Sequence, residues 1–105
     1  MIRACDVADL PDGEAIRILA HVPIAVFHVD GAYYAVDDTC THQDASLADG
    51  WVEGCTVECP LHAASFDLRT GVPLCLPAKT AVRTYPVVVS GGVIYVDTGV
   101  SEGVA

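Results

Sequence analysis

The chain has 105 residues, of which 52% are hydrophobic and 18% charged, and its formal net charge is −9. This length fits one domain spanning residues 1–105, and the composition excludes a disordered chain. No apolar run reaches the roughly eighteen residues of a membrane span, and phosphates would repel so acidic a chain, so we expect neither membrane nor nucleic acid as a partner. The N-terminus lacks the apolar core of a signal peptide, so we expect a cytoplasmic location.

The first third of the chain is rich in strand-forming residues. Residues 10–13 carry a proline–aspartate–glycine turn signal, and residues 15–19 predict an entry strand. Two β-rich runs follow at 23–29 and 32–37, joined by the dipeptide Asp30-Gly31. Because this dipeptide is typical of two-residue hairpin turns, we expect the two runs to pair as an antiparallel hairpin.

The rest of the chain continues this pattern of short strands and turns. The predicted elements are a hairpin of 50–52 and 56–58 flanking Glu53-Gly54, a strand at 65–68 turning at 69–71, an irregular segment with two prolines at 73–77, and a closing hairpin of 81–89 and 93–97. We expect Trp51 to pack in the core. Since no segment shows convincing helical periodicity, the sequence predicts an all-β domain of the sandwich or barrel type.

Two short cysteine–histidine pairs lie in the middle of the chain. Cys40 is followed by His42, and Cys59 by His62, with sixteen residues between the pairs. Two such loops lying side by side would offer two sulfurs and two nitrogens. This donor set suits a [2Fe–2S] cluster in which two histidines replace two cysteines on one iron. Zinc could use the same four residues in an interaction module, although zinc fingers usually take like ligands from each loop.

The two pairs and the sequence around them resemble a known family. CTH at 40–42 and CPLH at 59–62 look like the two boxes of Rieske iron–sulfur proteins. The resemblance continues through DASLADGW at 44–51, VECPLHAASFDLRTG at 57–71 and LCLPA at 74–78. Nearly the whole chain is covered, and it is most similar to the small Rieske-type ferredoxins of bacterial aromatic-ring-hydroxylating dioxygenases.

This resemblance implies a fold, a cofactor and a role. The fold is the all-β Rieske fold of small stacked antiparallel sheets, with two cluster-binding loops at one tip. His42 and His62 would bind one iron of a [2Fe–2S] cluster, Cys40 and Cys59 the other, and a loop around Pro77 would cover it. The chain would be a one-electron carrier, not an enzyme, between a flavoprotein NAD(P)H reductase and a terminal oxygenase. A Rieske small subunit of another redox enzyme, such as a nitrite reductase, is the alternative within the family.

Four departures from respiratory-chain Rieske proteins bear on the reduction potential. Those proteins have an extra cysteine in each loop and two hydroxyl donors after the second histidine, where this chain has Ala45, Leu61, Ala64 and Phe66. Hydrogen bonds to sulfur stabilise the electron-rich reduced state. Without them we expect a potential near the low end of the Rieske range, roughly −150 mV.

The remaining cysteines and histidines have no partner of the other type at ligand spacing. We expect Cys5, Cys55 and Cys75 to be packing residues or inert thiols. His28 lies within an apolar run and His21 lacks a paired cysteine, so we expect neither to bind metal.

Acidic residues dominate the central part of the chain. From residue 18 to residue 68 there is no lysine or arginine. The acids in this stretch are Asp30, Asp37, Asp38, Asp44, Asp49, Glu53, Glu58 and Asp67. One interpretation is a solvated surface that aids solubility, and the other is an acidic docking face on a monomer that meets its partners transiently.

Overall fold

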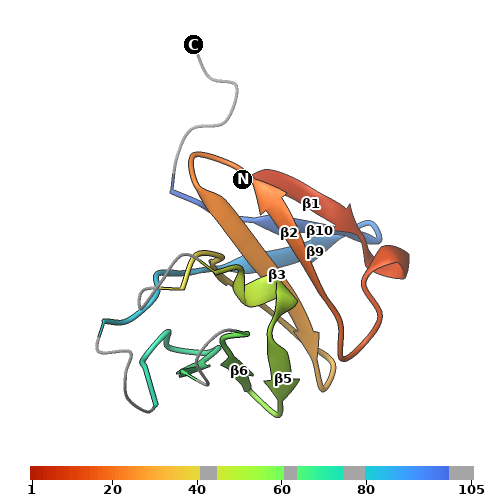
Figure 1. Ribbon diagram of the computed structural model, residues 1–105. Helices are drawn as coiled ribbons and strands as arrows, with labels where there is room; N and C mark the ends of the chain where they lie inside the picture. Colours follow the sequence, from red (N-terminus) through yellow and green to blue (C-terminus); the bar gives the residue numbers. More distant parts are fainter. Residues whose placement is uncertain (41–44, 61–63, 75–79, 100–105) are drawn as a thin grey trace.

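The computed structural model describes residues 1–40, 45–60, 64–74 and 80–99 (Figure 1). Within these residues ten strands form three antiparallel sheets, and helix is limited to two 3-10 turns. The strands are β1 Ile2–Asp6, β2 Ala15–Leu19, β3 Pro23–Val29, β4 Ala32–Asp37, β5 Trp51–Glu53, β6 Thr56–Glu58, β7 Ser65–Asp67, β8 Thr84–Tyr85, β9 Val87–Ser90 and β10 Val93–Val96. The 3-10 turns are η1 Val7–Asp9 and η2 Leu47–Asp49. None of the described helices has the length or the apolar character to cross a membrane.

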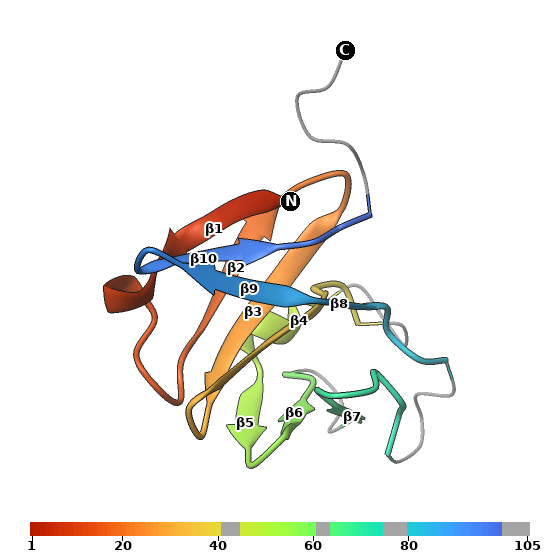
Figure 2. The same ribbon diagram turned by 180° about the vertical axis from the view of Figure 1, so that it is seen from behind.

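The three sheets are arranged around a shared middle layer. The strand orders are β1-β10-β9, β2-β3-β4-β8 and β5-β6-β7. Figure 1 shows β1, β10 and β9 crossing β2 and β3, while β5 and β6 lie at the opposite end of the molecule. From behind, β5, β6 and β7 lie side by side below β4 (Figure 2). The all-β prediction is therefore confirmed.

Strand β3 is buried on both faces, because each face contacts a different core. Ile24 and Val26 belong to a cluster with the β1-β10-β9 sheet, whose other buried members are Leu10, Ala35, Tyr85, Ile94 and Val96. Ala25, Phe27 and Val29 point the other way, since successive strand residues alternate between faces. Their cluster contains Val36, Cys40, Leu47, Val57, Cys59, Ala64, Phe66, Leu68 and Val82. This second core packs under the expected ligand loops.

The predicted β3–β4 hairpin is confirmed, including its turn. Val29 pairs with Ala32 across a two-residue loop. Asp30 and Gly31 have φ of 49° and 79°, as a type I′ turn requires. The carboxylate of Asp12 accepts hydrogen bonds from the backbone N–H groups of both residues. The entry strand at 15–19 is likewise confirmed as β2.

Two expectations about strands were wrong in detail, and one strand was not predicted. The segment 81–89 is not one strand, because Pro86 separates β8, which pairs with β4, from β9, which pairs with β10. Proline has no N–H for a ladder, so the chain changes sheet there. The turn between β5 and β6 consists of Gly54 and Cys55 instead of Glu53 and Gly54. Strand β1 was not anticipated, and it pairs with β10, far away in sequence.

The expectation that Trp51 packs in the core was also wrong. Its side chain is 63% exposed. The next residue, Val52, pairs with buried Val57 and packs against the core. Because strand side chains alternate, burying Val52 turns Trp51 toward solvent.

Candidate metal centre

Each of the two expected ligand loops is closed by a backbone hydrogen bond, and the two bonds are equivalent. The N–H of Cys40 donates to the carbonyl of Ala45 at 2.9 Å, and the N–H of Cys59 to that of Ala64 at 2.7 Å. Each bond encloses four residues. Cys40 is 3% exposed and Cys59 0%, and both belong to the core cluster below the loops. His42 and His62, the other two predicted ligands, lie outside the described residues.

Asp38 supports the first loop from below. Its carboxylate is 2% exposed and accepts hydrogen bonds from the hydroxyl of Ser46 at 2.8 Å and the N–H of Ala48 at 2.9 Å. Its carbonyl accepts from the N–H of Leu47 at 2.7 Å. Asp38 therefore joins the chain entering the loop to the chain leaving it. Sequence reasoning counted this residue among surface acids, and its signal was an acid directly following a buried strand.

The second loop is supported by backbone pairing. Strands β6 and β7 flank it and pair in register, with Val57 opposite Phe66 and both side chains fully buried. Gly50 is needed beside this pair, because a Cβ there would collide with the carbonyl oxygen of Glu58. Glu58 directly precedes Cys59, so this close approach places β5 against the start of the second loop.

The segment expected to cover the cluster is anchored at both ends. On the β7 side, the N–H of Leu74 donates to the carbonyl of Ser65 at 2.7 Å. On the other side, the N–H of Val82 donates to the carbonyl of Gly71 at 2.9 Å. Both anchors thus hold the segment to the strand and turn that leave the second loop. Pro77 itself lies outside the described residues.

Asp37, next to Asp38, forms hydrogen bonds with residues that follow that segment in the chain. Its carboxylate accepts a hydrogen bond from the hydroxyl of Tyr85 at 2.5 Å, and its N–H donates to the carbonyl of Arg83 at 2.9 Å. Burial, together with this hydrogen bond to a carboxylate, raises the pKa of Tyr85 to about 12. The two neighbouring aspartates therefore fasten two different segments to the end of β4.

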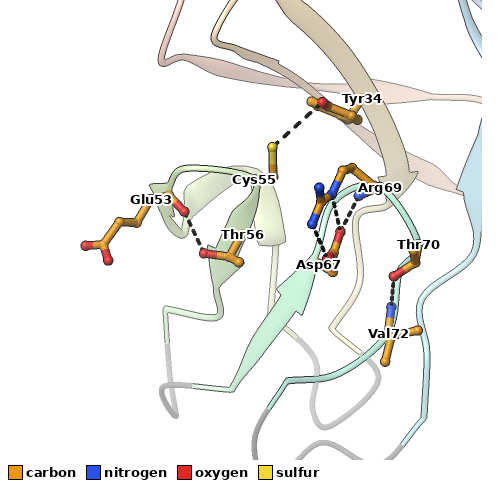
Figure 3. Close-up of polar contacts among 8 residues, drawn as sticks. All are labelled: Tyr34, Glu53, Cys55, Thr56, Asp67, Arg69, Thr70 and Val72. Atoms are coloured by element: carbon orange, nitrogen blue, oxygen red, sulfur yellow. Dashed lines mark hydrogen bonds and ion pairs between the residues drawn. The ribbon is translucent and has the colours of Figure 1, made fainter.

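The other described cysteines lie away from the ligand loops. Cys55 is in the β5–β6 turn, at the far end of these strands from Cys59, and its sulfur lies 3.7 Å from the hydroxyl of Tyr34 (Figure 3). This hydrogen bond raises the pKa of Tyr34. Arg69 nearby is paired with Asp67 at 3.1 Å. Cys5 packs against the other core, and burial raises the pKa of its thiol. Cys75 lies outside the described residues.

His28 has partners of its own, as expected for a structural histidine. Its Nδ1 lies 2.8 Å from the carbonyl oxygen of Leu10, and its ring stacks on Tyr33. His21 lies edge-on to the ring of Tyr85. In the part of the chain that the structure describes, no group of three or more histidine, cysteine or acidic side chains is placed to hold a metal ion.

The acidic face is smaller than the sequence suggested. Asp38 is buried, and Asp37 and Asp67 are engaged by Tyr85 and Arg69. Asp30 lies in the β3–β4 turn, at the opposite end of β4 from the loops. The described acids that flank the loops and reach solvent are Asp49 and, partly, Glu58.

The donor set fits an iron–sulfur group. Two buried cysteines in equivalently closed loops offer thiolates in an apolar environment, and the sequence places one histidine two or three residues after each. A family model for the Rieske [2Fe–2S] domain matches residues 1–86. The chain belongs to the Rieske [2Fe–2S] family. Its cofactor is a [2Fe–2S] cluster, which removes the support for the zinc alternative.

Related proteins narrow this assignment to the ferredoxins. The chain is 56% identical to the 3-phenylpropionate/cinnamic acid dioxygenase ferredoxin subunit of Escherichia coli K12, over 91% of this chain and 92% of that one. The ferredoxin of Sphingomonas yanoikuyae B1 is 37% identical with a TM-score of 0.87, covering 92% of this chain and 97% of that one. A chain from a complex of oxygenase and ferredoxin in carbazole 1,9a-dioxygenase is 35% identical, with a TM-score of 0.87 and 90% of both chains covered. The chain is therefore a Rieske-type ferredoxin, an electron carrier.

Proposed function

We propose that Cys40, His42, Cys59 and His62 hold the cluster. The burial of both cysteines and the matching closure of their loops support this assignment. When bound, the cluster takes up and releases one electron. The two thiolates would offset the two positive charges of the oxidised iron–sulfide core, whereas four thiolates would leave it at −2. An added electron then costs less, which raises the potential above that of plant-type ferredoxins.

Single substitutions test the ligand set. Replacing Cys40 or Cys59 by Ser, or His42 or His62 by Ala, should abolish the cluster. The control is Cys55→Ser, which alters a thiol of the same sheet at the far end from the loops, and it should keep about two irons and two acid-labile sulfides per chain. Iron loss in the control, or iron retained in a ligand variant, would contradict the assignment.

We further propose that the chain is the ferredoxin subunit of an aromatic-ring dioxygenase of the phenylpropionate/cinnamate type. In this role it carries single electrons from a flavoprotein NAD(P)H reductase to a terminal oxygenase, as a cytoplasmic monomer with one domain over residues 1–105. The observation that carries the proposal is the 56% identity with such a ferredoxin over 91% of the chain. The carrier never contacts the aromatic compound, so substrate choice belongs to the oxygenase.

Reconstitution tests this role. The holoprotein is mixed with the reductase and oxygenase of the Escherichia coli phenylpropionate dioxygenase, and substrate-dependent NADH oxidation is followed. Product should form only when the ferredoxin is present, and apoprotein is the control. The nitrite reductase alternative predicts no product here and electron transfer to a nitrite-reducing subunit instead.

We propose that charge steers these encounters. Asp49 follows the first loop in the chain and is exposed, and Glu58 precedes the second loop and is partly exposed, so both contribute to the negative potential near the loops. A shuttle must release each partner, which favours small interfaces steered by charge. Association should therefore slow as salt rises, because the Debye length falls from about 30 Å at 0.01 M to about 10 Å at 0.1 M. Asp49→Asn should lower the second-order rate at which the reductase reduces the ferredoxin. Asp30→Asn, in the β3–β4 turn away from the loops, should leave that rate unchanged.

A further inference from the structure

Four side chains form a row across the outer face of the β5-β6-β7 sheet. Trp51 pairs with Glu58, and Glu58 pairs with Ser65, in the registers of the two antiparallel ladders. Leu74 extends the row, because its N–H bonds to the carbonyl of Ser65 and its neighbour Pro73 forms a bridge with Phe66. Directly opposed residues of antiparallel strands project from the same face. Val57 and Phe66, which adjoin Glu58 and Ser65 along their strands and point to the opposite face, are fully buried, so the row faces outward.

The two ends of the row are large apolar side chains in water. Trp51 is 63% exposed and Leu74 51% exposed, while Glu58 and Ser65 between them are half-buried. With strands about 4.8 Å apart, the row is roughly 14 Å wide. An exposed tryptophan is costly for a small acidic protein that must stay dispersed, and tryptophan is the residue type most enriched at binding hot spots.

The position of the row relates it to electron transfer. Glu58 directly precedes Cys59, and Ser65 directly follows Ala64, whose carbonyl closes the second loop. The row therefore borders the loop that carries Cys59, and a partner that reaches this loop from the sheet side must contact it. A parallel row of Glu53, Thr56 and Asp67 lies at the other end of the same strands, farther from the loop.

We propose that Trp51, Glu58, Ser65 and Leu74 form a docking surface for the terminal oxygenase. This inference rests on the proposed function. A complex of oxygenase and ferredoxin exists for a protein 35% identical to this chain, which supports an oxygenase as occupant. Charge complementarity predicts an arginine or lysine of the oxygenase opposite Glu58, in a position to lie over the indole of Trp51. Apolar side chains of the oxygenase would pack against the indole and Leu74.

The test compares electron transfer from reduced holoprotein to the oxygenase of the Escherichia coli phenylpropionate dioxygenase by stopped flow. Trp51→Ser should lower the second-order rate at least tenfold, Trp51→Phe less than threefold, and Leu74→Ser about threefold. The matched control is Val89→Ser, which removes an apolar residue 46% exposed on a different sheet and should stay within twofold of wild type. Unchanged visible absorption and circular dichroism in each variant establish an intact cluster and fold.

The salt dependence of the transfer rate distinguishes the charged part of the surface, Glu58, from its apolar part, Trp51. The loss caused by Glu58→Gln should shrink as ionic strength rises to 1 M, where the Debye length is about 3 Å, whereas the loss caused by Trp51→Ser should persist. Glu53→Gln, in the distant row, is the charge control.

The outcomes distinguish this inference from the function on which it rests. If the wild-type protein passes no electrons to the oxygenase, the proposed function fails. If it does, and Trp51→Ser transfers electrons within twofold of wild type, the docking surface is wrong while the function stands. A loss confined to reduction by the reductase also overturns the assignment of this surface to the oxygenase.

Discussion

Asp38→Ala should destabilise the protein strongly, because the carboxylate is buried and joins both ends of the first ligand loop. The substitution leaves two donors, the hydroxyl of Ser46 and the N–H of Ala48, without their acceptor. Each orphaned donor costs about 1–3 kcal/mol, so we expect a total of roughly 2–6 kcal/mol. At about 4 °C per kcal/mol for a domain of this size, the midpoint should fall by roughly 8–24 °C.

The assay follows loss of visible cluster absorption during heating at one fixed scan rate, since cluster loss makes unfolding irreversible. Asp38→Asn keeps an oxygen acceptor but loses the charge, so its midpoint should fall less than that of Asp38→Ala. Ser46→Ala should cost about 1 kcal/mol, and its effect should be smaller in the Asp38→Ala background, because the two groups share one bond. A midpoint for Asp38→Ala within 2 °C of wild type would refute the reasoning.

Three further predictions concern other parts of the structure. Tyr85, whose pKa rises from 10 to about 12 on folding, contributes stability that is fully present below pH 10 and lost as pH rises toward 12; phenolate absorbance, compared with Tyr85→Phe, should show one group titrating near pH 12. Ala64→Ser with Phe66→Tyr should raise the reduction potential measured by redox titration from roughly −150 mV, and a wild-type value well above zero would contradict this. Gly71→Ala should lower the thermal midpoint, because φ is 77° and a Cβ would collide with the carbonyl of Val82; Gly13→Ala, which also has positive φ but open space, separates strain from collision.

Local signals in the sequence were sufficient for the β3–β4 hairpin. A two-residue type I′ turn requires positive φ at both central positions, and Asp30-Gly31 is one of the few dipeptides that favour this. The turn and the pairing of its flanking strands therefore follow directly. Cys40 and Cys59 were likewise predictable as a pair, and the structure places both in one buried cluster. Their assignment as ligands remains a proposal.

Long-range pairing was not predictable in this way. β1 meets β10 across almost the whole chain, and nothing in its local composition identifies that partner. The role of Asp38 depends on Ser46 and Ala48 coming within hydrogen-bond distance of its carboxylate, which happens only in the folded loop. The exposure of Trp51 depends on the register of a three-residue strand, where a shift by one residue exchanges the buried and solvent faces.

The two ligand loops have equivalent closures but different supports, and this asymmetry has a physical consequence. The first loop has a backbone bond from Leu47 to the Asp38 carbonyl and depends in addition on a side chain, since the Asp38 carboxylate accepts from Ser46 and Ala48. The second loop rests on paired strands, whose ladder uses backbone groups that substitution leaves in place. A single substitution at Asp38 therefore removes part of the support of the first loop. The second loop is held by the same sheet that carries the exposed Trp51, so a partner seated on that face contacts strands whose backbone pairing a side-chain substitution leaves in place.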